Sequence, residues 1–388
     1  MSPSRRSVAL LGATGSIGIQ TLDVLRQERE RFELVAIAGG EQLSELAAIA
    51  AEFNVKYVGV KSEHHRSVLA DLLSSDVAIV MGDEGLRSLS QSADVVVNAV
   101  MGFAGLPVTL GALAAGKRLA LANKESLIAA APLVATVRNT SGAELLPIDS
   151  EHCAIHQCLA SSPDLAGHPD VKRILLTASG GPFRGWSAEQ LKGATKEDAL
   201  RHPTWSMGPK ITIDSSTLVN KGLEVLEASA LFGIDVERVE VVVHPQSIVH
   251  SMVEYVDGSV LAQLSRPDMR LPIAYCLGLP ERLTHPYGQL DFSTALDLSF
   301  EPPDYAAFPA LGLAYEAARL AGAAPAWFSA ANEVAVAAFL ADEINWWDIV
   351  VIVASTMDHY VADPLNSLAS LYENDDTARR WARASLKK

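Results

Sequence analysis

The sequence predicts an α/β protein that contains a doubly wound parallel sheet, a central mixed α/β part and a small C-terminal helical bundle. Three observations predict it. Short continuous apolar runs alternate with helix-length segments up to about residue 149, which is typical of a parallel sheet covered on both faces. Longer strand-like runs with a hairpin turn follow. Helical periodicity then returns from about residue 310 to the end of the chain.

Six apolar runs in the first part are interpreted as strands, and the segment 16–29 as the helix after the first of them. The runs lie at 7–11, 34–38, 56–60, 77–80, 94–100 and 118–122. Four further runs are expected to be strands of a mixed sheet, at 145–149, 173–178, 239–244 and 251–264. The last contains Asp257-Gly258, a sequence that favours a tight hairpin turn.

Two stretches lack strand or helix periodicity. The stretch 180–210 is rich in glycine and proline and carries Trp186, Trp205 and Met207. A long loop with large apolar side chains is often a flexible lid over a site. The stretch 279–309 has several prolines and is expected to be a linker. The predicted division is therefore 1–149, 150–278, 279–309 and 310–388.

Composition and charge limit the possible function classes. The chain has 388 residues, of which 49% are hydrophobic and 20% charged, so it can form two or three domains with a large core. Its net charge of −15 argues against a nucleic-acid surface. A phosphorylated ligand would have to be captured by local donors.

Cysteine usage and the N-terminal segment indicate the cellular compartment. The three cysteines form no CxxC pair, which fits a reducing compartment and no disulfide framework. Cys153 and Cys158 are interpreted as packing residues. The opening run MSPSRRSVALLGATG has an apolar stretch that is too short and too broken by glycine for a signal peptide or membrane span. A soluble, cytoplasmic protein without a membrane partner is expected.

A glycine-rich turn, Gly12 to Gly18 (GATGSIG), follows the first strand and opens a helix. Glycines let the backbone approach a pyrophosphate, and free N–H groups at the helix start bind its charge. The first part is therefore expected to be a Rossmann-like dinucleotide-binding domain, with a merely structural turn as the alternative. Glu41 follows the second strand, where an acid can bond a ribose 2′-hydroxyl and repel a 2′-phosphate, or simply cap the next helix.

Polar residues at two further strand ends are candidate ligand contacts. The triplet Asn123-Lys124-Glu125 follows the strand 118–122, where ligands bind in such sheets, although a solvated helix first turn is the alternative. Asp149 ends the strand 145–149, and Glu151 lies in the first turn of the next helix. The helix dipole favours acids there without any function.

A second cluster lies in DSSTLVNKGLEVLE, residues 214–227. On a helix expected to begin near Ser215, Asn220, Glu224 and Glu227 lie on one side. Together with Asp149 and Glu151, Glu224 would supply oxygen ligands for a hard divalent cation, while the Ser, Asn and Lys side chains favour a phosphate. A solvated helix face is the alternative. Gly222 costs roughly 1 kcal/mol inside a helix, which indicates a close approach to the backbone.

Histidines 202, 244 and 250 are candidate metal ligands, but for each alone a structural role is the better interpretation.

The motifs described above lie in sequence blocks that follow one another in this order: GATGSIG, LANKESL, LLPIDSEHCAI, LLTASGGPF, HPTWSMGPKITIDSSTLVNKGLEVLEA, HPQSIVHSMVEYVDGSVLAQL, RPDMRLPIAY and AANEVAVAAFL. Together they resemble the 1-deoxy-D-xylulose 5-phosphate reductoisomerase family of the non-mevalonate isoprenoid route, nearly end to end.

The resemblance implies a homodimeric oxidoreductase that isomerises a small phosphorylated sugar and reduces it with NADPH and a divalent metal (Mn²⁺, Mg²⁺ or Co²⁺). It implies Lys124, Asp149, Glu151 and Glu224 as catalytic residues, the last three as metal ligands. Substrate contacts would come from Ser150, Glu151, Ser179, His202, Trp205, Met207, Ser215, Asn220, Lys221 and Glu224. Cofactor contacts would come from Thr14, Gly15, Ser16, Ile17, Gly39, Asn123, Lys124, Glu125 and Gly208.

The sequence departs from the family at Gly40-Glu41, where members commonly have a small or basic residue followed by Asn. NADPH is still the expected cofactor. Two other readings remain open from the residues alone. One is a metal-dependent dehydrogenase that decarboxylates hydroxy acids, and the other is a nucleotide-sensing regulator without catalysis. The acids at 149, 151 and 224 count against the second, because a sensor does not need them.

Overall fold

The structure is a computed structural model that describes residues 5–161, 167–205 and 207–386. The chain forms two compact units. The first unit contains residues 1–127, 134–153 and 268–288, and the second contains residues 128–133, 154–267 and 289–388. The four-part division expected from the sequence stays a prediction beside this grouping.

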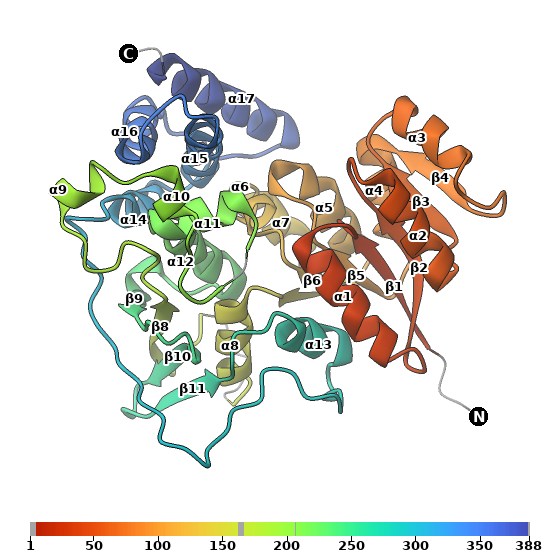
Figure 1. Cartoon of the computed structure of the whole chain (residues 1–388), viewed down its shortest axis with the longest axis horizontal. Coiled ribbons are helices and arrows are strands. Elements are labelled where there is room, and N and C mark those ends of the chain that lie inside the picture. Colours follow the sequence, from red (N-terminus) through yellow and green to blue (C-terminus); the bar gives the residue numbers. More distant parts are fainter. Residues whose placement is uncertain (1–4, 162–166, 206, 387–388) are drawn as a thin grey trace. The chain divides into compact units, whose positions relative to one another are not determined.

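The first unit is built on a seven-stranded parallel sheet in the order β4-β3-β2-β1-β5-β6-β7 (Figure 1). Its strands are β1 Arg6–Leu11, β2 Phe32–Ala38, β3 Tyr57–Val60, β4 Ala78–Met81, β5 Val95–Asn98, β6 Arg118–Leu121 and β7 Glu144–Pro147. The strand order reverses beside β1, which is the switch point of a doubly wound sheet. The predicted parallel sheet is confirmed.

The helices that follow these strands are α1 Ser16–Gln27, α2 Leu43–Phe53, α3 Glu63–Ala70, α4 Gly82–Leu89, η1 Gly102–Gly105, α5 Leu106–Ala114, α6 Lys124–Ala129, α7 Ala131–Val137 and α8 Ser150–Leu159. A later helix, α13 Arg270–Gly278, returns to the first unit and contacts α1. Cys276 of α13 lies in the same apolar core as Cys153. All three cysteines are free and buried, which confirms the packing role expected for Cys153 and Cys158.

The second unit contains a four-stranded mixed sheet in the order β11-β10-β8-β9. Its strands are β8 Val171–Ala178, β9 Val239–Val243, β10 Val249–Tyr255 and β11 Val260–Leu264. β8 and β9 are parallel, whereas β10 is antiparallel to both β8 and β11. The predicted hairpin is present, with Gly258 at a φ of 88° in its turn. The expected mixed sheet is confirmed, but the run 145–149 is not part of it: it forms β7 of the parallel sheet, where it pairs with β6.

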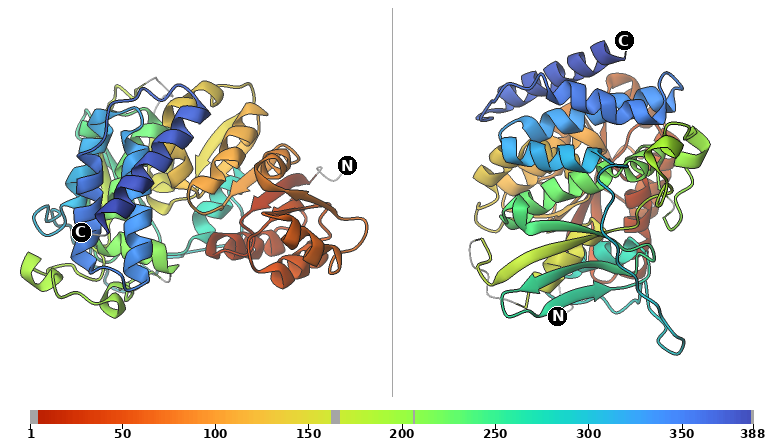
Figure 2. Two further views of the ribbon diagram at one scale, coloured as in Figure 1. Left: turned by 90° about the horizontal axis from the view of Figure 1, so that it is seen from above. Right: turned by 90° about the vertical axis from the view of Figure 1, so that its left-hand side faces the viewer.

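Helices form the rest of the second unit: α9 Ala188–Leu191, α10 Lys196–Ala199, α11 Pro209–Ser216, α12 Val219–Phe232, η2 Val236–Arg238, α14 Ala310–Leu320, α15 Ala324–Leu340, α16 Trp346–Met357 and α17 Leu368–Ser385. Helix α12 contacts β9 as well as α14, and α15 contacts both α16 and α17. Figure 2 shows this succession from strands through α12 to the C-terminal helices. The predicted C-terminal helices are confirmed.

The stretch 180–210 is not a plain loop, because α9 and α10 lie within it. The Ser187 side chain accepts from the N–H of Gln190 and forms a capping box with it. Thr195 accepts from the N–H of Asp198 in the same way. Ser-x-x-Gln and Thr-x-x-Asp are helix-start signals, so these short helices could have been predicted from local sequence.

The prediction of a single helix that begins near Ser215 is wrong, because α11 ends at Ser216 and a separate helix, α12, begins at Val219. Leu218 between them has a φ of 57°, in the left-handed region. The hydroxyls of Ser216 and Thr217 donate to the carbonyl of Ile213, 2.7 and 3.2 Å away, and such bonds compete with helix continuation. The break separates Ser215 from the polar side chains of α12.

Gly222 of α12 has the close neighbour that its position indicated. A Cβ at Gly222 would lie 2.6 Å from the Cβ of Ala314, so α14 packs directly against this turn.

In the fully described stretch 279–309 the structure has no helix or strand, and Glu301 alone pairs with Val243 of β9. Among the described residues, none of the helices combines the length and apolar character that a membrane crossing requires.

Candidate active site

The glycine turn after β1 has the geometry of an anion-binding loop. Gly12 has a φ of 96°, and a Cβ there would lie 2.3 Å from the carbonyl oxygen of Ala99. A Cβ at Gly18 would lie 2.2 Å from the carbonyl oxygen of Gly12. Gly15, the N-cap of α1, makes no side-chain cap hydrogen bond, and no acid lies in the first turn. The N-terminus of α1 therefore fits a pyrophosphate.

The predicted contacts Thr14, Gly15, Ser16 and Ile17 occupy this turn, and each is partly or fully exposed. The backbone N–H groups of Gly12 and Ala13 donate to the carbonyl of Ala38, at 2.9 and 2.8 Å, and so hold the end of β2 beside the turn. Gly39 comes next and donates to Gly59 of β3 at 3.2 Å.

Glu41 does not cap the helix that follows it. Helix α2 begins at Leu43 with Gln42 as its N-cap, and it has no side-chain cap hydrogen bond. The Glu41 carboxylate instead pairs with Nε2 of His65 on α3, at 3.3 Å. The capping alternative is therefore wrong, and an acid does lie at the end of β2.

The Asn123-Lys124-Glu125 triplet opens α6 at the carboxyl end of β6. The Asn123 amide donates to the carbonyls of Val100 and Gly102, both at 2.7 Å, and its oxygen accepts from the N–H of Ser126 at 3.2 Å. Asn123 thus caps α6 and fixes the loop after β5. Lys124 is 6% exposed, so the solvated Lys–Glu pair considered from the sequence is wrong for this lysine.

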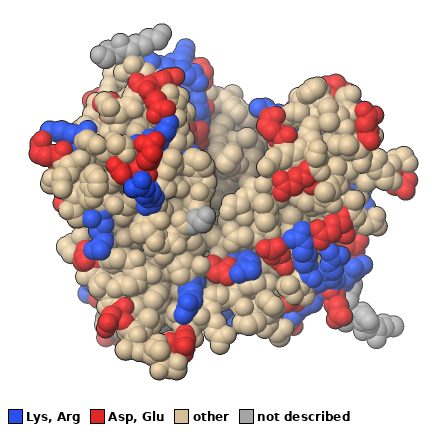
Figure 3. All heavy atoms as spheres, in the orientation of Figure 1, with Lys and Arg blue, Asp and Glu red and all other residues tan. Residues whose placement is uncertain are grey.

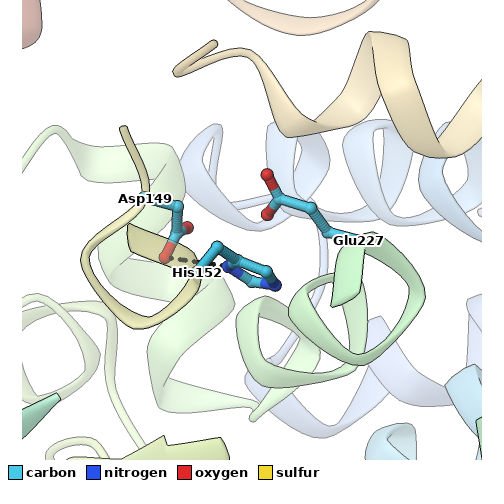
Figure 4. A group of neighbouring side chains, drawn as sticks. All are labelled: Asp149, His152 and Glu227. Atoms are coloured by element: carbon cyan, nitrogen blue, oxygen red, sulfur yellow. Dashed lines mark ion pairs between the residues drawn. The ribbon is translucent and has the colours of Figure 1, made fainter. Parts of the chain in front are cut away.

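Asp149 lies between the end of β7 and the start of α8, and three groups of the first unit surround it. Lys124 forms an ion pair with it, Nδ1 of His152 lies 3.3 Å from Oδ1, and the Glu151 N–H donates to Oδ1 at 3.3 Å. Figure 4 draws the Asp149–His152 pair. Burial by itself raises the pKa of Asp149, but the Lys124 charge and His152 hold that pKa well below its usual range.

Asp149 is therefore an ionised oxygen donor at neutral pH. Glu151 lies in the first turn of α8, as predicted, where its Oε2 accepts from the Ser150 hydroxyl at 2.5 Å. His152 was missed in the sequence, although it lies three residues after Asp149 on a helix, a spacing that brings two side chains together. Ser150, Glu151 and Asp149 form a compact oxygen-rich group.

In the second unit, His202 connects two of the predicted phosphate contacts. Its Nε2 lies 3.1 Å from the hydroxyl oxygen of Ser179 and 3.1 Å from that of Ser215. Its Nδ1 accepts from the backbone N–H groups of Thr204 and Trp205, at 3.2 and 2.9 Å. An accepting Nδ1 places the proton of the neutral ring on Nε2, facing the two hydroxyls.

Gly181 allows the loop after β8 to lie close to the end of α11. Gly181 has a φ of 67°, and a Cβ there would lie 2.7 Å from the carbonyl oxygen of Ser215. Its N–H donates to the hydroxyl of Ser179 at 3.2 Å. The loop after β8 can therefore lie directly on the end of α11. The structure thus brings together three residues that lie far apart in the sequence: Ser179, His202 and Ser215.

Helix α12 carries the remaining polar residues of the second unit. The Asn220 amide donates to Oε1 of Glu224 at 2.5 Å, and Lys221 forms an ion pair with the other carboxylate oxygen. Lys221 and Glu224 are 4% and 1% exposed, so the solvated-face alternative is wrong. A buried carboxylate that is hydrogen-bonded and paired is typical of a functional or tightly structural position.

Asp214 of α11 was not predicted as a site residue, although it is 1% exposed. Nζ of Lys210 lies 2.7 Å from Oδ2 of Asp214, and the Asn332 amide donates to Oδ1 at 2.8 Å. The i, i+4 spacing of Lys210 and Asp214 was the available signal. Through Asn332, the ion pair ties α11, which also carries Ser215, to α15.

Trp205 and Gly208 precede α11. The Trp205 ring lies 6.2 Å from that of His250, and Gly208 is the extended N-cap of α11. Met207 is partly exposed.

His244 has the structural role expected from the sequence. Its Nδ1 hydrogen-bonds to the carbonyl of Ser299 at 2.8 Å, and its Nε2 accepts from the backbone N–H of Val249 at 3.1 Å.

Three family models match the chain: 1-deoxy-D-xylulose 5-phosphate reductoisomerase over residues 8–131, its C-terminal domain over residues 145–232, and the DXP reductoisomerase C-terminal domain over residues 264–381. The reductoisomerase of Chlorobium chlorochromatii is 49% identical over 98% of this chain and 99% of its own length. That of Thermosynechococcus vestitus is 46% identical over 98% and 92%.

Solved structures give the same result. The Zymomonas mobilis reductoisomerase in complex with NADPH has a TM-score of 0.91 and 43% identity, over 99% of this chain and all of that one. A DOX-P reductoisomerase in complex with NADPH, fosmidomycin and magnesium has a TM-score of 0.91 and 42% identity, over 98% of each chain. The protein therefore belongs to the 1-deoxy-D-xylulose 5-phosphate reductoisomerase family.

Proposed function

We propose that the protein is a metal-dependent reductoisomerase that converts 1-deoxy-D-xylulose 5-phosphate and NADPH into 2-C-methyl-D-erythritol 4-phosphate in the non-mevalonate isoprenoid route. The observation that carries this proposal is Asp149, which Lys124 and His152 keep ionised at the carboxyl edge of the sheet. The N-terminus of α1 opens at the same edge, because the strands are parallel. Family membership over nearly the whole chain supports it.

The residues present fit both implied groups. The uncapped N-terminus of α1 and the close backbone at Gly12 suit a dinucleotide, with cofactor contacts proposed at Thr14, Gly15, Ser16, Ile17, Gly39, Asn123, Lys124, Glu125 and Gly208. The carboxylates of Asp149, Glu151 and Glu224 are the oxygen donors that Mg²⁺, Mn²⁺ or Co²⁺ would use. When bound, these groups would supply a hydride and positive charge that stabilises developing alkoxide or enolate charge.

The side chains of the second unit are suited to hold the substrate phosphate. Nε2–H of His202 and the hydroxyls of Ser179 and Ser215 converge, and Asn220 and Lys221 add an amide and a cation on α12. Charge-assisted bonds to a phosphate orient the substrate at a distance from the reacting carbons. Figure 3 shows acidic and basic side chains interspersed on one face, so these local donors, and not a broad basic field, would capture the phosphate.

The direct test is NADPH oxidation with purified 1-deoxy-D-xylulose 5-phosphate, with and without Mn²⁺. We expect turnover that stops when a chelator removes the metal and returns when Mn²⁺ is restored. Metal-independent oxidation, or none with this substrate, would contradict the proposed activity. Malate-like and isopropylmalate-like acids serve as negative controls for a decarboxylating dehydrogenase.

We further propose that residues 180–210 close over the bound substrate and exclude water. Support comes from Trp205, whose backbone N–H donates to Nδ1 of His202, from the large apolar side chain of Met207 two residues later, and from the glycines at 180 and 181. Substrate should therefore change the fluorescence of Trp205. The measurement compares wild type with Trp205→Phe, and uses Trp381→Phe on the exposed face of α17 as the control. An identical substrate response in wild type and Trp205→Phe would argue against closure.

We also propose a homodimer that pairs through β11, an edge strand of the second sheet. Val260 and Leu261 on this strand are 47% and 40% exposed, and exposed apolar edge strands favour pairing with another chain. Leu261→Glu should therefore yield a monomer by light scattering. Val351→Glu, at a 50% exposed position on α16, is the matched control. A monomeric wild type, or a Leu261→Glu protein that remains dimeric, would contradict this interface.

A cytoplasmic location without nucleic-acid or membrane partners is also proposed. Three free buried cysteines fit a reducing compartment, and a net charge of −15 disfavours nucleic acid. Fractionation of the native cells checks this, since recovery of the protein with membranes or in an oxidising compartment would contradict it.

A further inference from the structure

The C-terminal helices hold α11 by the two residues that flank Ser215. Asp214, which precedes Ser215, accepts a hydrogen bond from the Asn332 amide of α15 at 2.8 Å. Ser216, which follows it, accepts one from the indole N–H of Trp346 on α16, also at 2.8 Å. Residues two apart on a helix point in nearly opposite directions, because each step turns by about 100°. The two bonds therefore fix both the rotation and the position of the turn that carries the Ser215 hydroxyl.

Both bonds are shielded from water, because all four side chains that form them are buried. The Ser216 hydroxyl also donates to the carbonyl of Ile213 at 2.7 Å, so it both donates and accepts within the protein. Helix α11 lies beside α15 (Figure 1). A buried polar network that is satisfied in this way holds the elements that it joins in one arrangement.

Trp346 also contacts the loop after β8, which carries Ser179. Its ring packs edge-to-face against that of Phe183 in this loop, with 5.2 Å between the ring centroids. One tryptophan therefore holds α11 with its N–H group and the loop with its ring. The hydroxyl oxygens of Ser179 and Ser215 both lie 3.1 Å from Nε2 of His202. Their convergence depends on the spacing between α11 and the loop, which Trp346 sets.

Stability alone does not account for an amide at position 332. Oδ1 of Asn332 is buried and has no hydrogen-bond partner among the residues that the structure describes. A buried polar atom in that state destabilises a fold, whereas an apolar side chain of similar size would pack between the helices without this cost. The amide is explained by its N–H group, which donates to Asp214 and so orients the helix of Ser215.

We propose that Asn332 and Trp346 are positioning residues of the phosphate pocket, which hold the Ser179 and Ser215 hydroxyls at the separation that a phosphate requires. This inference rests on the proposed function, because that function places the substrate phosphate at these hydroxyls. Both residues act through α11 and the loop after β8, without touching the phosphate. The C-terminal helices thereby take part in substrate binding.

Trp346→Phe removes the N–H group and keeps an aromatic ring against Phe183. The affinities for 1-deoxy-D-xylulose 5-phosphate and for inorganic phosphate should each fall about tenfold, the size of effect expected for one buried hydrogen bond. Calorimetry on the whole protein measures both Kd values. The Kd for NADPH should stay unchanged, because the glycine turn lies in the first unit. In steady-state kinetics the change should appear in KM more than in kcat, as loss of uniform binding does.

Trp327→Phe is the matched control. Trp327 on α15 is also buried, and its indole N–H donates to the Asn374 side chain of α17 at 2.8 Å. This bond joins two C-terminal helices to each other and not to α11. Its loss should lower the melting temperature about as much as Trp346→Phe does but leave both Kd values at the wild-type level. Equal weakening of phosphate binding in the two variants would show a general structural effect and would overturn the proposal.

Ser216 tests the same bond from its other end. Ser216→Ala removes the acceptor and should weaken phosphate binding as Trp346→Phe does. The double variant should bind no more weakly than either single variant, because both changes remove one shared bond. Ser216→Thr keeps a hydroxyl and should retain the wild-type affinity. Asn332→Leu, which removes the donor to Asp214, should also weaken phosphate binding.

Wild-type affinity for phosphate in both Trp346→Phe and Asn332→Leu would contradict the positioning role, as would a wild type that binds neither phosphate ligand. Failure of the proposed reductoisomerase function gives a different pattern. In that case the wild type would not turn over 1-deoxy-D-xylulose 5-phosphate, while inorganic phosphate would still bind it more tightly than it binds Trp346→Phe.

Discussion

Glu224→Gln is expected to abolish metal-dependent turnover, with a loss of about a thousandfold or more in kcat, because the change removes a negative oxygen donor from the proposed metal site. Glutamine has nearly the same shape and can still accept from the Asn220 amide, which lies 2.5 Å from Oε1. NADPH binding should remain nearly intact, because the glycine turn and β2 belong to the first unit. The measurement is NADPH oxidation as a function of Mn²⁺, together with cofactor calorimetry.

Two further variants make this result interpretable. Glu237→Gln removes an exposed carboxylate of the same unit that pairs with Arg319, and it should leave turnover at the wild-type level. Glu224→Asp retains the charge on a shorter side chain and should recover part of the activity at high Mn²⁺. Unchanged turnover in Glu224→Gln would refute the ligand assignment.

Lys221→Ala is expected to lower kcat/KM by about a hundredfold, mainly through KM, because it removes a buried cation from the proposed phosphate pocket. Lys221 also pairs with Glu224, and its loss leaves that carboxylate more negative. The apparent affinity for Mn²⁺ should therefore not fall, which separates a phosphate role from a metal role. Steady-state kinetics at several substrate and Mn²⁺ concentrations check both expectations.

Lys221→Arg, which keeps a cation at the same position, should retain more of the substrate affinity than Lys221→Ala. Lys172→Ala, which removes an exposed lysine paired with Glu254 on β10, is the matched control and should behave like wild type. A wild-type kcat/KM in Lys221→Ala would show that the phosphate pocket lies elsewhere.

The strands of the first unit could be predicted because their signals are local. Each is a short apolar run bounded by polar or glycine residues, and burial on both faces of a parallel sheet requires such runs. Helix boundaries in the second unit were harder to predict from the sequence. The break between α11 and α12 depends on the left-handed Leu218 and on hydroxyls that bond the preceding turn. In contrast, α9 and α10 have local cap signals at Ser187 and Thr195, which the glycine and proline content of the stretch outweighed in the prediction.

Candidate residues were predictable by type, but their chemical state was not. A carboxylate after a strand end suggests a ligand, yet only the structure shows that Lys124 and His152 depress the pKa of Asp149. Likewise, the sequence contains Ser179, His202 and Ser215 as separate residues. The tautomer of His202 follows only from backbone N–H groups that bond its Nδ1.

The sequence by itself determined the parallel sheet, the glycine turn before α1, the acids at 149, 151 and 224, and the family, because each depends on residue type and short-range spacing. Tertiary structure alone decided that Lys221 and Glu224 are buried, that Glu41 faces His65, that Gly222 accommodates α14, and that α13 returns to the first unit. The physical reason is that burial and ion pairing depend on side chains from distant parts of the chain, which local sequence patterns do not encode.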